Sequence, residues 1–337
     1  MNRRKFIQIA GAAVALAGVP HAARAIASAD VPKPPAGGWG GFTRNADFYV
    51  TTYGATPRVD PSLWRLKIHG LVKNSLELDL KAVKSLPPVN ETLTLECIGN
   101  PPNGTVIGNA RWVGPNLGSL LERARPSGKA VYAKLRAADG YTTGIPIDEL
   151  MRKENFLPYL MNGVPLPPEH GYPLRIFIPG KYGMKQPKWL TEIEFVDHEF
   201  IGYWEARGWT NSGWRKVNSG FFYPQANYSL LDVVAPEAQV RAPVEMVGWA
   251  LAGPSGIRRV DVSTDDGQTW NAAELSVNHS PYIWTIWKYR FAPPERGRYH
   301  VRVRATDGDG HSQPPSDPDR AAGMSAQVRL ALAVTTD

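Results

Sequence analysis

The feature that most constrains this chain is a short strand that ends in its only cysteine. Residues 93–96 alternate leucine with threonine and glutamate, which is the period of a half-buried strand. Cys97 follows at once, and the run 99–104, rich in Gly, Asn and Pro, ends the strand and lets the backbone approach other groups closely. A single cysteine excludes an internal disulfide, a CxxCH haem site and a cysteine-ligated iron–sulfur cluster within this sequence.

Two interpretations of Cys97 follow from its residue type. A free cysteine is most often a small buried hydrophobe. The alternative is a thiolate that binds a soft metal. Residues 95–100, Leu-Glu-Cys-Ile-Gly-Asn, resemble the molybdenum-ligand segment of the sulfite oxidase family. In that family a cysteine sulfur binds molybdenum and a molybdopterin dithiolene supplies further sulfurs, so the resemblance implies that Cys97 is the metal ligand and part of the catalytic centre.

The overall charge carries less information than it first suggests. The chain of 337 residues has a net charge of +7, but residues 1–29 hold four basic residues and no acidic one. Subtracting these four leaves +3 for the remainder, and no long Lys/Arg run occurs there, so a nucleic-acid-binding protein is not expected. With 43% hydrophobic and 20% charged residues, the composition is that of a globular chain with room for two domains.

Residues 1–29 are expected to be an export signal. The run 2–7, Asn-Arg-Arg-Lys-Phe-Ile, resembles the twin-arginine motif, and the apolar stretch 7–19 is too short to span a membrane. Small residues at 23–25 or 27–29 provide a cleavage site. The alternative is an uncleaved membrane anchor. A twin-arginine signal implies a periplasmic protein that is exported folded, often with its cofactor inserted.

The rest of the chain divides into two predicted domains, 30–233 and 234–337, with the break near Val234. In the first domain, residue alternation and helical spacing of apolar residues predict strands 64–70 and 131–137 and helices 117–124 and 147–152. In the second, turn signals separate short strands, as in an immunoglobulin-like β-sandwich. These predicted strands are 244–248, 257–263, 283–291, 299–305 and 325–331.

Residues 262–270, Val-Ser-Thr-Asp-Asp-Gly-Gln-Thr-Trp, resemble the C-terminal dimerisation domain of the same family. The resemblance therefore implies an α+β fold. A sulfite oxidase-type mixed α/β molybdopterin-binding domain over 30–233 is followed by an immunoglobulin-like dimerisation domain over 234–337. A homodimer formed through the second domain is the corresponding expectation.

A second motif lies between Tyr159 and Leu190. A predicted buried strand at 176–178 leads into a basic loop with Lys181 and Lys185, which suits a phosphate, although a solvated lysine loop is the commoner case. The order MNGxxLPxxHGxPxR, PGxxG and KWL resembles the sulfite oxidase family, and the loop also resembles its periplasmic sulfoxide-reductase branch. The resemblance implies that His170 and Arg175 contact the pterin and that Gln186, Pro187 and Lys188 hold its phosphate.

The entry segment of the first domain carries further expected cofactor contacts. Residues 48–61 resemble, without gaps, the family segment in which FFVRNH precedes a later VDP. The alignment places Thr51 at the family's substrate-binding arginine and Tyr53 at a pterin-contacting histidine. The resemblance implies a cofactor site formed by Tyr49, Val50, Thr51, Tyr53 and Asp139 in addition to the residues above. For Asp139, followed by Gly140, a plain turn is the alternative.

The substrate expectation differs from sulfite. Where the family has Gly-Asn-Arg-Arg, residues 99–102 are Gly-Asn-Pro-Pro. Counting from Lys188, the family's catalytic tyrosine falls on Trp209, whose indole N–H donates a hydrogen bond but cannot relay a proton. A dianion needs charge-assisted hydrogen bonds. We therefore expect oxygen-atom transfer on a small neutral or weakly charged substrate such as a sulfoxide.

The resemblance also implies an electron partner. The expected cofactor is molybdenum–molybdopterin, and with no haem motif in the chain the electrons pass to or from an external carrier, such as a c-type cytochrome or a membrane haem subunit. Two alternatives remain open. One is a cofactor-free exported binding protein that uses the aromatic stretch 203–223. The other is a scaffold subunit that kept the fold and lost the cofactor.

Overall fold

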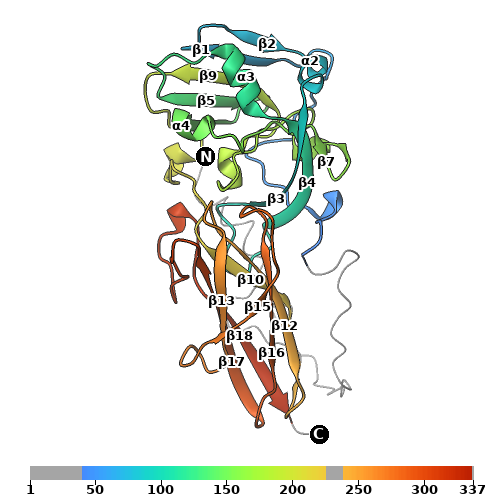
Figure 1. Ribbon diagram of the computed structural model, residues 1–337, viewed down its shortest axis with the longest axis vertical. Helices are drawn as coiled ribbons and strands as arrows, with labels where there is room; N and C mark the ends of the chain where they lie inside the picture. The colour runs from blue at the N-terminus through green and yellow to red at the C-terminus, as the bar shows by residue number, and fades with distance from the viewer. Residues whose placement is uncertain (1–39, 225–237, 336–337) are drawn as a thin grey trace, which may run out of the picture.

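The computed structural model describes residues 40–224 and 238–335 as an elongated molecule with two lobes (Figure 1). The predicted signal 1–29 and the predicted domain break at Val234 lie outside the described residues. Within the described ranges, no helix has the length and apolar character needed to cross a membrane.

A five-stranded mixed sheet forms the centre of the first lobe. Its order is β2-β1-β9-β5-β6; β1 and β9 are parallel, and the other neighbours are antiparallel. Leu66 and Ile68 alternate with exposed or half-buried residues along β1, so one face of the strand enters the core. The strands are β1 (Leu66–Gly70), β2 (Leu76–Leu78), β5 (Tyr132–Ala137), β6 (Thr142–Pro146) and β9 (Leu190–Val196).

Short helices cover this sheet. Helix α3 has the predicted bounds, Leu117–Ala124, and its residues 117, 120, 121 and 124 are all buried in the core. The Asn116 side chain caps its first turn by accepting a hydrogen bond from the Gly118 amide at 2.8 Å. The other helices are α2 (Leu80–Lys84) and α4 (Ile147–Leu150), with 3₁₀ turns at Asn45–Asp47, Pro168–His170, Gly183–Lys185, Glu205–Arg207 and Arg320–Ala322.

A second sheet, of order β3-β4-β7-β8, carries the cysteine. Strands β3 and β4 pair along their length, from Pro88 opposite Pro115 to Glu96 opposite Ile107, so Cys97 stands directly after the last pair. The bounds are β3 (Pro88–Glu96), β4 (Ile107–Pro115), β7 (Leu160–Met161) and β8 (Val164–Pro165). The predicted strand at 176–178 is wrong: this buried segment forms only an isolated bridge, between Phe177 and Phe156.

The second lobe is a β-sandwich, as predicted. One sheet has the order β10-β12-β16-β15 and the other β11-β18-β17-β13-β14. Strand β10 lies before the predicted break at Val234 but pairs with β12, so the sandwich takes in residues that the sequence assigned to the first domain. The strands are β10 (Asn218–Tyr223), β11 (Ala238–Gln239), β12 (Val244–Leu251), β13 (Ile257–Ser263), β14 (Asn271–Ala272), β15 (Glu274–Leu275), β16 (Thr285–Phe291), β17 (Gly297–Asp307) and β18 (Val328–Thr335).

The two lobes meet on strand β3. The Thr94 amide donates to the Tyr282 carbonyl at 3.0 Å, and the Trp284 amide donates to the Thr94 hydroxyl at 2.9 Å. Ile107 of β4 packs in one buried cluster with Trp249 and other sandwich residues. The strand that leads to Cys97 is therefore held from both domains.

Candidate functional site

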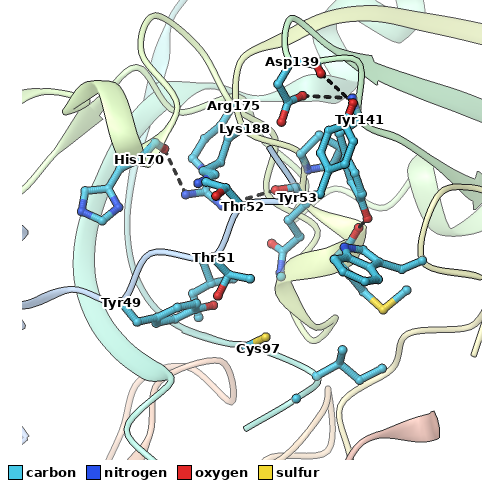
Figure 2. Close-up of a pocket in the computed structure, with 18 of the residues that line it drawn as sticks. Tyr49, Thr51, Thr52, Tyr53, Cys97, Asp139, Tyr141, His170, Arg175 and Lys188 are labelled. Carbon is cyan, nitrogen blue, oxygen red and sulfur yellow. Dashed lines mark hydrogen bonds between the residues drawn. The ribbon is translucent and has the colours of Figure 1, made fainter. Parts of the chain in front are cut away.

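A cavity of about 200 Å³ opens around Cys97 and collects most of the predicted site residues (Figure 2). It lies between the 48–53 segment, the end of β3, the β5–β6 turn and the loops before β9. The predicted residues that line it are Tyr49, Thr51, Tyr53, Cys97, Asp139, His170, Arg175, Gln186, Pro187, Lys188 and Trp209. Val50 does not line it and is 49% exposed, so this predicted site residue is wrong: the local backbone turns it to solvent while Tyr49 and Thr51 on either side line the cavity.

The thiol of Cys97 is held at the end of β3 by backbone hydrogen bonds. The Cys97 amide donates to the Val106 carbonyl at 3.0 Å, and the Asn100 amide donates to the Cys97 carbonyl at 2.9 Å. Burial raises the pKa of the Cys97 thiol, while hydrogen bonds from the Gly99 amide and Thr51 act against this rise. The half-buried thiol thus keeps its proton at neutral pH when alone, and a bound soft metal would replace that proton.

A buried polar network fixes the loop beneath this cysteine. Glu96 Oε1 accepts from the Asn100 side chain at 3.0 Å and from the Asn218 side chain, on β10 of the sandwich, at 2.8 Å. Arg215 Nε lies 4.0 Å from Glu96 Oε2, and both side chains are at most 1% exposed. Burial raises the pKa of Glu96 and lowers that of Arg215. The Glu96 carboxylate therefore links the loop after Cys97, through Asn100, to the sandwich domain, through Asn218.

At another part of the cavity lies a buried guanidinium. Arg175 is 3% exposed and donates to two backbone carbonyls, of His170 at 3.1 Å and of Gln186 at 3.3 Å. Burial lowers the pKa of Arg175 to about 10. Its Nε has no hydrogen-bond partner in the described part of the chain. A buried donor without a partner is costly, so this side chain fits a site whose ligand is an anion.

Lys188 stands beside this arginine (Figure 2). Its Nζ donates to the Glu169 carbonyl at 2.8 Å, and burial together with Arg175 lowers the pKa of Lys188 to about 7. Asp139 is the one carboxylate among the described residues lining the cavity, and burial raises its pKa. His170 Nε2 lies 3.0 Å from the Asn45 carbonyl, and burial lowers the pKa of this imidazole. The donors outnumber the acidic groups, which is the chemistry a phosphate-bearing cofactor requires.

The two other lysines of this stretch do not reach the cavity. Lys181 Nζ lies 2.6 Å from Glu149 Oε2, and Lys185 forms a fully buried ion pair with Glu205. Both lysine side chains are 0% exposed. The loop is therefore neither a solvated lysine loop nor a cradle in which every lysine is available to a phosphate. Only Lys188 has that position.

Several residues on the cavity lining were not predicted from the sequence. Tyr141 is buried and donates its hydroxyl to the Met184 carbonyl at 2.6 Å. Its neighbour Asp139 accepts from the Tyr141 amide at 3.0 Å, so the turn alternative also holds for that residue. Proximity of Tyr141 to Asp139 in the sequence was the available signal. The further lining residues include Phe48, Thr52, Ile98, Met184 and Trp204.

Comparison with known proteins agrees with this architecture. The family model for the oxidoreductase molybdopterin binding domain matches residues 53–204, and the model for the Mo-co oxidoreductase dimerisation domain matches residues 215–329, which includes β10.

Relatives and solved structures support the same grouping. Mitochondrial sulfite oxidase of Mus musculus is 29% identical over 82% of this chain and 58% of its own length, so the chain spans little more than half of that relative. The uncharacterized oxidoreductase YuiH of Bacillus subtilis is 33% identical over 46% of this chain and 76% of its own. The fold resembles the sulfane dehydrogenase SoxCD from Paracoccus pantotrophus, with a TM-score of 0.73, 20% identity and coverage of 88% and 84%. The chain belongs to the sulfite oxidase family of molybdopterin-dependent oxidoreductases.

Proposed function

We propose that this protein transfers an oxygen atom to or from a small, weakly charged substrate, with molybdenum–molybdopterin bound in the cavity around Cys97. One observation carries the proposal. The buried Arg175 and the half-buried Lys188 donate to backbone carbonyls, with no carboxylate within ion-pair distance among the described residues, and they share a cavity with the single thiol. An anionic cofactor would supply the missing negative charge.

Each part of the cavity has its own task in this proposal. Cys97 would bind the metal, while Arg175, Lys188 and His170, with the Gln186–Pro187 segment, would hold the pterin and its phosphate. When bound, the cofactor supplies two-electron chemistry and oxygen exchange. The chain itself excludes water, since Phe48, Leu95 and Ile98 are buried side chains of the lining.

The substrate follows from the charges near the thiol. In the alignment with the sulfite oxidase family, Thr51 and the proline pair 101–102 occupy positions that are arginine in that family. Trp209, in place of the tyrosine, offers a hydrogen-bond donor without a proton relay. Each hydrogen bond to a charged group contributes roughly 1.5–3 kcal/mol, so a dianion would bind weakly here. This supports a neutral oxygen-atom donor or acceptor such as a sulfoxide.

The setting of the enzyme is part of the same proposal. The twin-arginine-like start supports a periplasmic location, and the dimerisation-domain match supports a homodimer. An external electron carrier, of the c-type cytochrome or membrane-haem class, would exchange electrons with the protein one at a time.

Elemental analysis tests the proposal. We expect about one molybdenum per chain in the folded, exported protein. Cys97→Ser should lose most of it, and Glu91→Gln, an exposed change on the same strand, should retain it. Absence of molybdenum from protein made in cells that synthesise the cofactor would overturn the proposal in favour of a cofactor-free binding or scaffold protein.

A further inference from the structure

The charged and apolar residues of the cavity are separated. Figure 2 shows Arg175 and Lys188 together on one side of Thr51, with Cys97 on the other. Other lining residues carry no charge: Ile98 and Met184 belong to a buried apolar cluster against which Trp204 and Trp209 pack, and Thr51 gives the Cys97 thiol a hydrogen bond. Ile98, which follows Cys97 directly in the chain, and Trp209 thus belong to an apolar and aromatic part of the lining.

Gly99 leaves a gap between the thiol and one of these indoles. A β-carbon built on Gly99 would lie 3.9 Å from Cys97 Sγ and 3.9 Å from Trp209 Cη2. The sulfur and the indole edge are thus at most twice that distance apart, with an unsubstituted backbone as the floor between them. Gly99 is not one of the described glycines with a positive φ, so its backbone does not itself require glycine.

The charged side chain nearest to Cys97 in the sequence, Glu96, is not available to a ligand in this gap. The Glu96 carboxylate is occupied by Asn100 and Asn218. Trp209 lies beside the gap, and the residues that share its cluster on the cavity lining, Ile98, Met184 and Trp204, carry no charge. An anion placed here would lose its hydration without an ionic partner, whereas an aromatic ring would gain contact with the indole.

We propose that the gap over Gly99 is an apolar subsite that binds the hydrocarbon group, preferentially an aromatic ring, of an uncharged substrate. Trp209 is then a specificity-determining residue that replaces an ionic contact with an aromatic one. The inference rests on the proposed function and names the substrate class of the same cavity: S-oxides and related oxides that carry an aryl group next to the polar oxygen.

Ligand binding tests this without turnover. Calorimetry on molybdenum-loaded protein would use methyl phenyl sulfone, dimethyl sulfone and sulfate, none of which needs to react. We expect the phenyl compound to bind at least tenfold more tightly than dimethyl sulfone, and sulfate to bind most weakly. Equal affinity for the two sulfones, or preference for sulfate, would overturn the inference.

Variants of Gly99 and Trp209 test whether the subsite lies between these two residues. Gly99→Ala adds a methyl group in van der Waals contact with both walls, so it should weaken methyl phenyl sulfone at least tenfold while dimethyl sulfone changes less. Gly128→Ala is the matched control, because its β-carbon would meet nothing within 4 Å. Trp209→Ala should also lose the phenyl preference and Trp209→Phe should keep most of it, which gives a second test if Gly99→Ala does not fold.

Molybdenum content measured on the same samples separates the two proposals. Wild-type protein without molybdenum contradicts the proposed function. Loaded protein whose phenyl preference is missing, or survives both Gly99→Ala and Trp209→Ala, contradicts the subsite alone.

Discussion

Four basic residues between positions 175 and 188 fall into two pairs that differ in their partners; Arg175, Lys181 and Lys185 are buried and Lys188 is half-buried. Lys181 and Lys185 each meet a glutamate carboxylate. Arg175 and Lys188 donate to backbone carbonyls, and no carboxylate of the described chain lies within ion-pair distance of either. The charges of Lys181 and Lys185 are thus neutralised by carboxylates of the protein itself, whereas the charges of Arg175 and Lys188 are not.

The difference separates structure from binding. A buried charge is costly unless a partner neutralises it. The lysines with glutamate partners therefore hold loops together, and their removal should unfold the protein. The cations without such partners are withdrawn from water, Arg175 fully and Lys188 in part, at a cost that an external anion would offset, so their removal should affect binding more than folding.

The largest expected effect is on the ion pair Lys185–Glu205. Glu205→Ala leaves Lys185 buried without its carboxylate, which should lower the free energy of unfolding by about 3–5 kcal/mol. Urea unfolding measures this. Replacing both residues together, by Lys185→Met and Glu205→Leu, should cost clearly less than the single change. A single variant as stable as the wild type would remove the distinction between the two pairs.

The second prediction concerns the pair without carboxylate partners. Lys188→Met removes a half-buried charge that lacks a carboxylate partner, so the cofactor-free protein should lose no stability. Affinity for inorganic phosphate should fall ten- to a hundredfold, as expected for loss of roughly 1.5–3 kcal/mol from a hydrogen bond to a charged group. Calorimetry and thermal melting measure the two quantities separately. Lys188→Met that unfolds like Glu205→Ala would show that Lys188 is structural.

The pH dependence sharpens the same contrast. The pKa of Lys188 is lowered to about 7, against 10.5 for an ordinary lysine. Between these values the unfolded chain binds more protons than the folded one, so this group makes cofactor-free protein more stable as pH rises through that window. Phosphate affinity should fall as pH rises through about 7, because only the charged ammonium attracts the anion.

The comparison of wild type with Lys188→Met isolates this contribution from that of Lys181, whose pKa is lowered to about 8. Unfolding measured from pH 6 to 10 should show a steeper rise in the wild type than in the variant. Identical pH slopes in the two proteins would mean that Lys188 does not change protonation on folding.

The smallest effect is expected at an exposed pair. Lys67 Nζ lies 3.7 Å from Glu77 Oε2, and both side chains are 57% exposed. Lys67→Gln should change the free energy of unfolding by roughly 0–1 kcal/mol, because solvent screens the interaction. Urea unfolding beside Glu205→Ala provides the scale. A cost near that of Glu205→Ala would mean that burial is not what makes an ion pair structural.

The sequence predicted local elements well and distant pairings poorly. Helix 117–124 and the main sandwich strands follow from periodicity, which is a local property. The parallel pairing of β1 with β9 and the membership of β10 in the sandwich depend on segments that are far apart or cross a predicted break. Periodicity contains no information on such partners.

The candidate site shows the same limit. A resemblance in sequence brought Trp209 to the cavity although it is distant from Cys97 in the chain, and the structure places both on the lining. The resemblance could not show that Lys185 is structural and Lys188 faces the cavity, because Lys185 pairs with the buried carboxylate of Glu205, which comes from another loop. It included Val50 for its place in a motif, while the direction of that side chain depends on the local backbone.

The contact between the two lobes has a consequence for the order of synthesis. Thr94, three residues before the cysteine, is bonded to Tyr282 and Trp284, and Glu96 to Asn218. The ribosome adds these partners long after it has made the cysteine. Strand β3, which positions the thiol, therefore gains all of these hydrogen bonds only after most of the sandwich has been translated. A cofactor that binds in the formed cavity then binds to a nearly complete chain. A truncation inside the sandwich should then abolish cofactor binding around Cys97, although this cavity lies in the other domain.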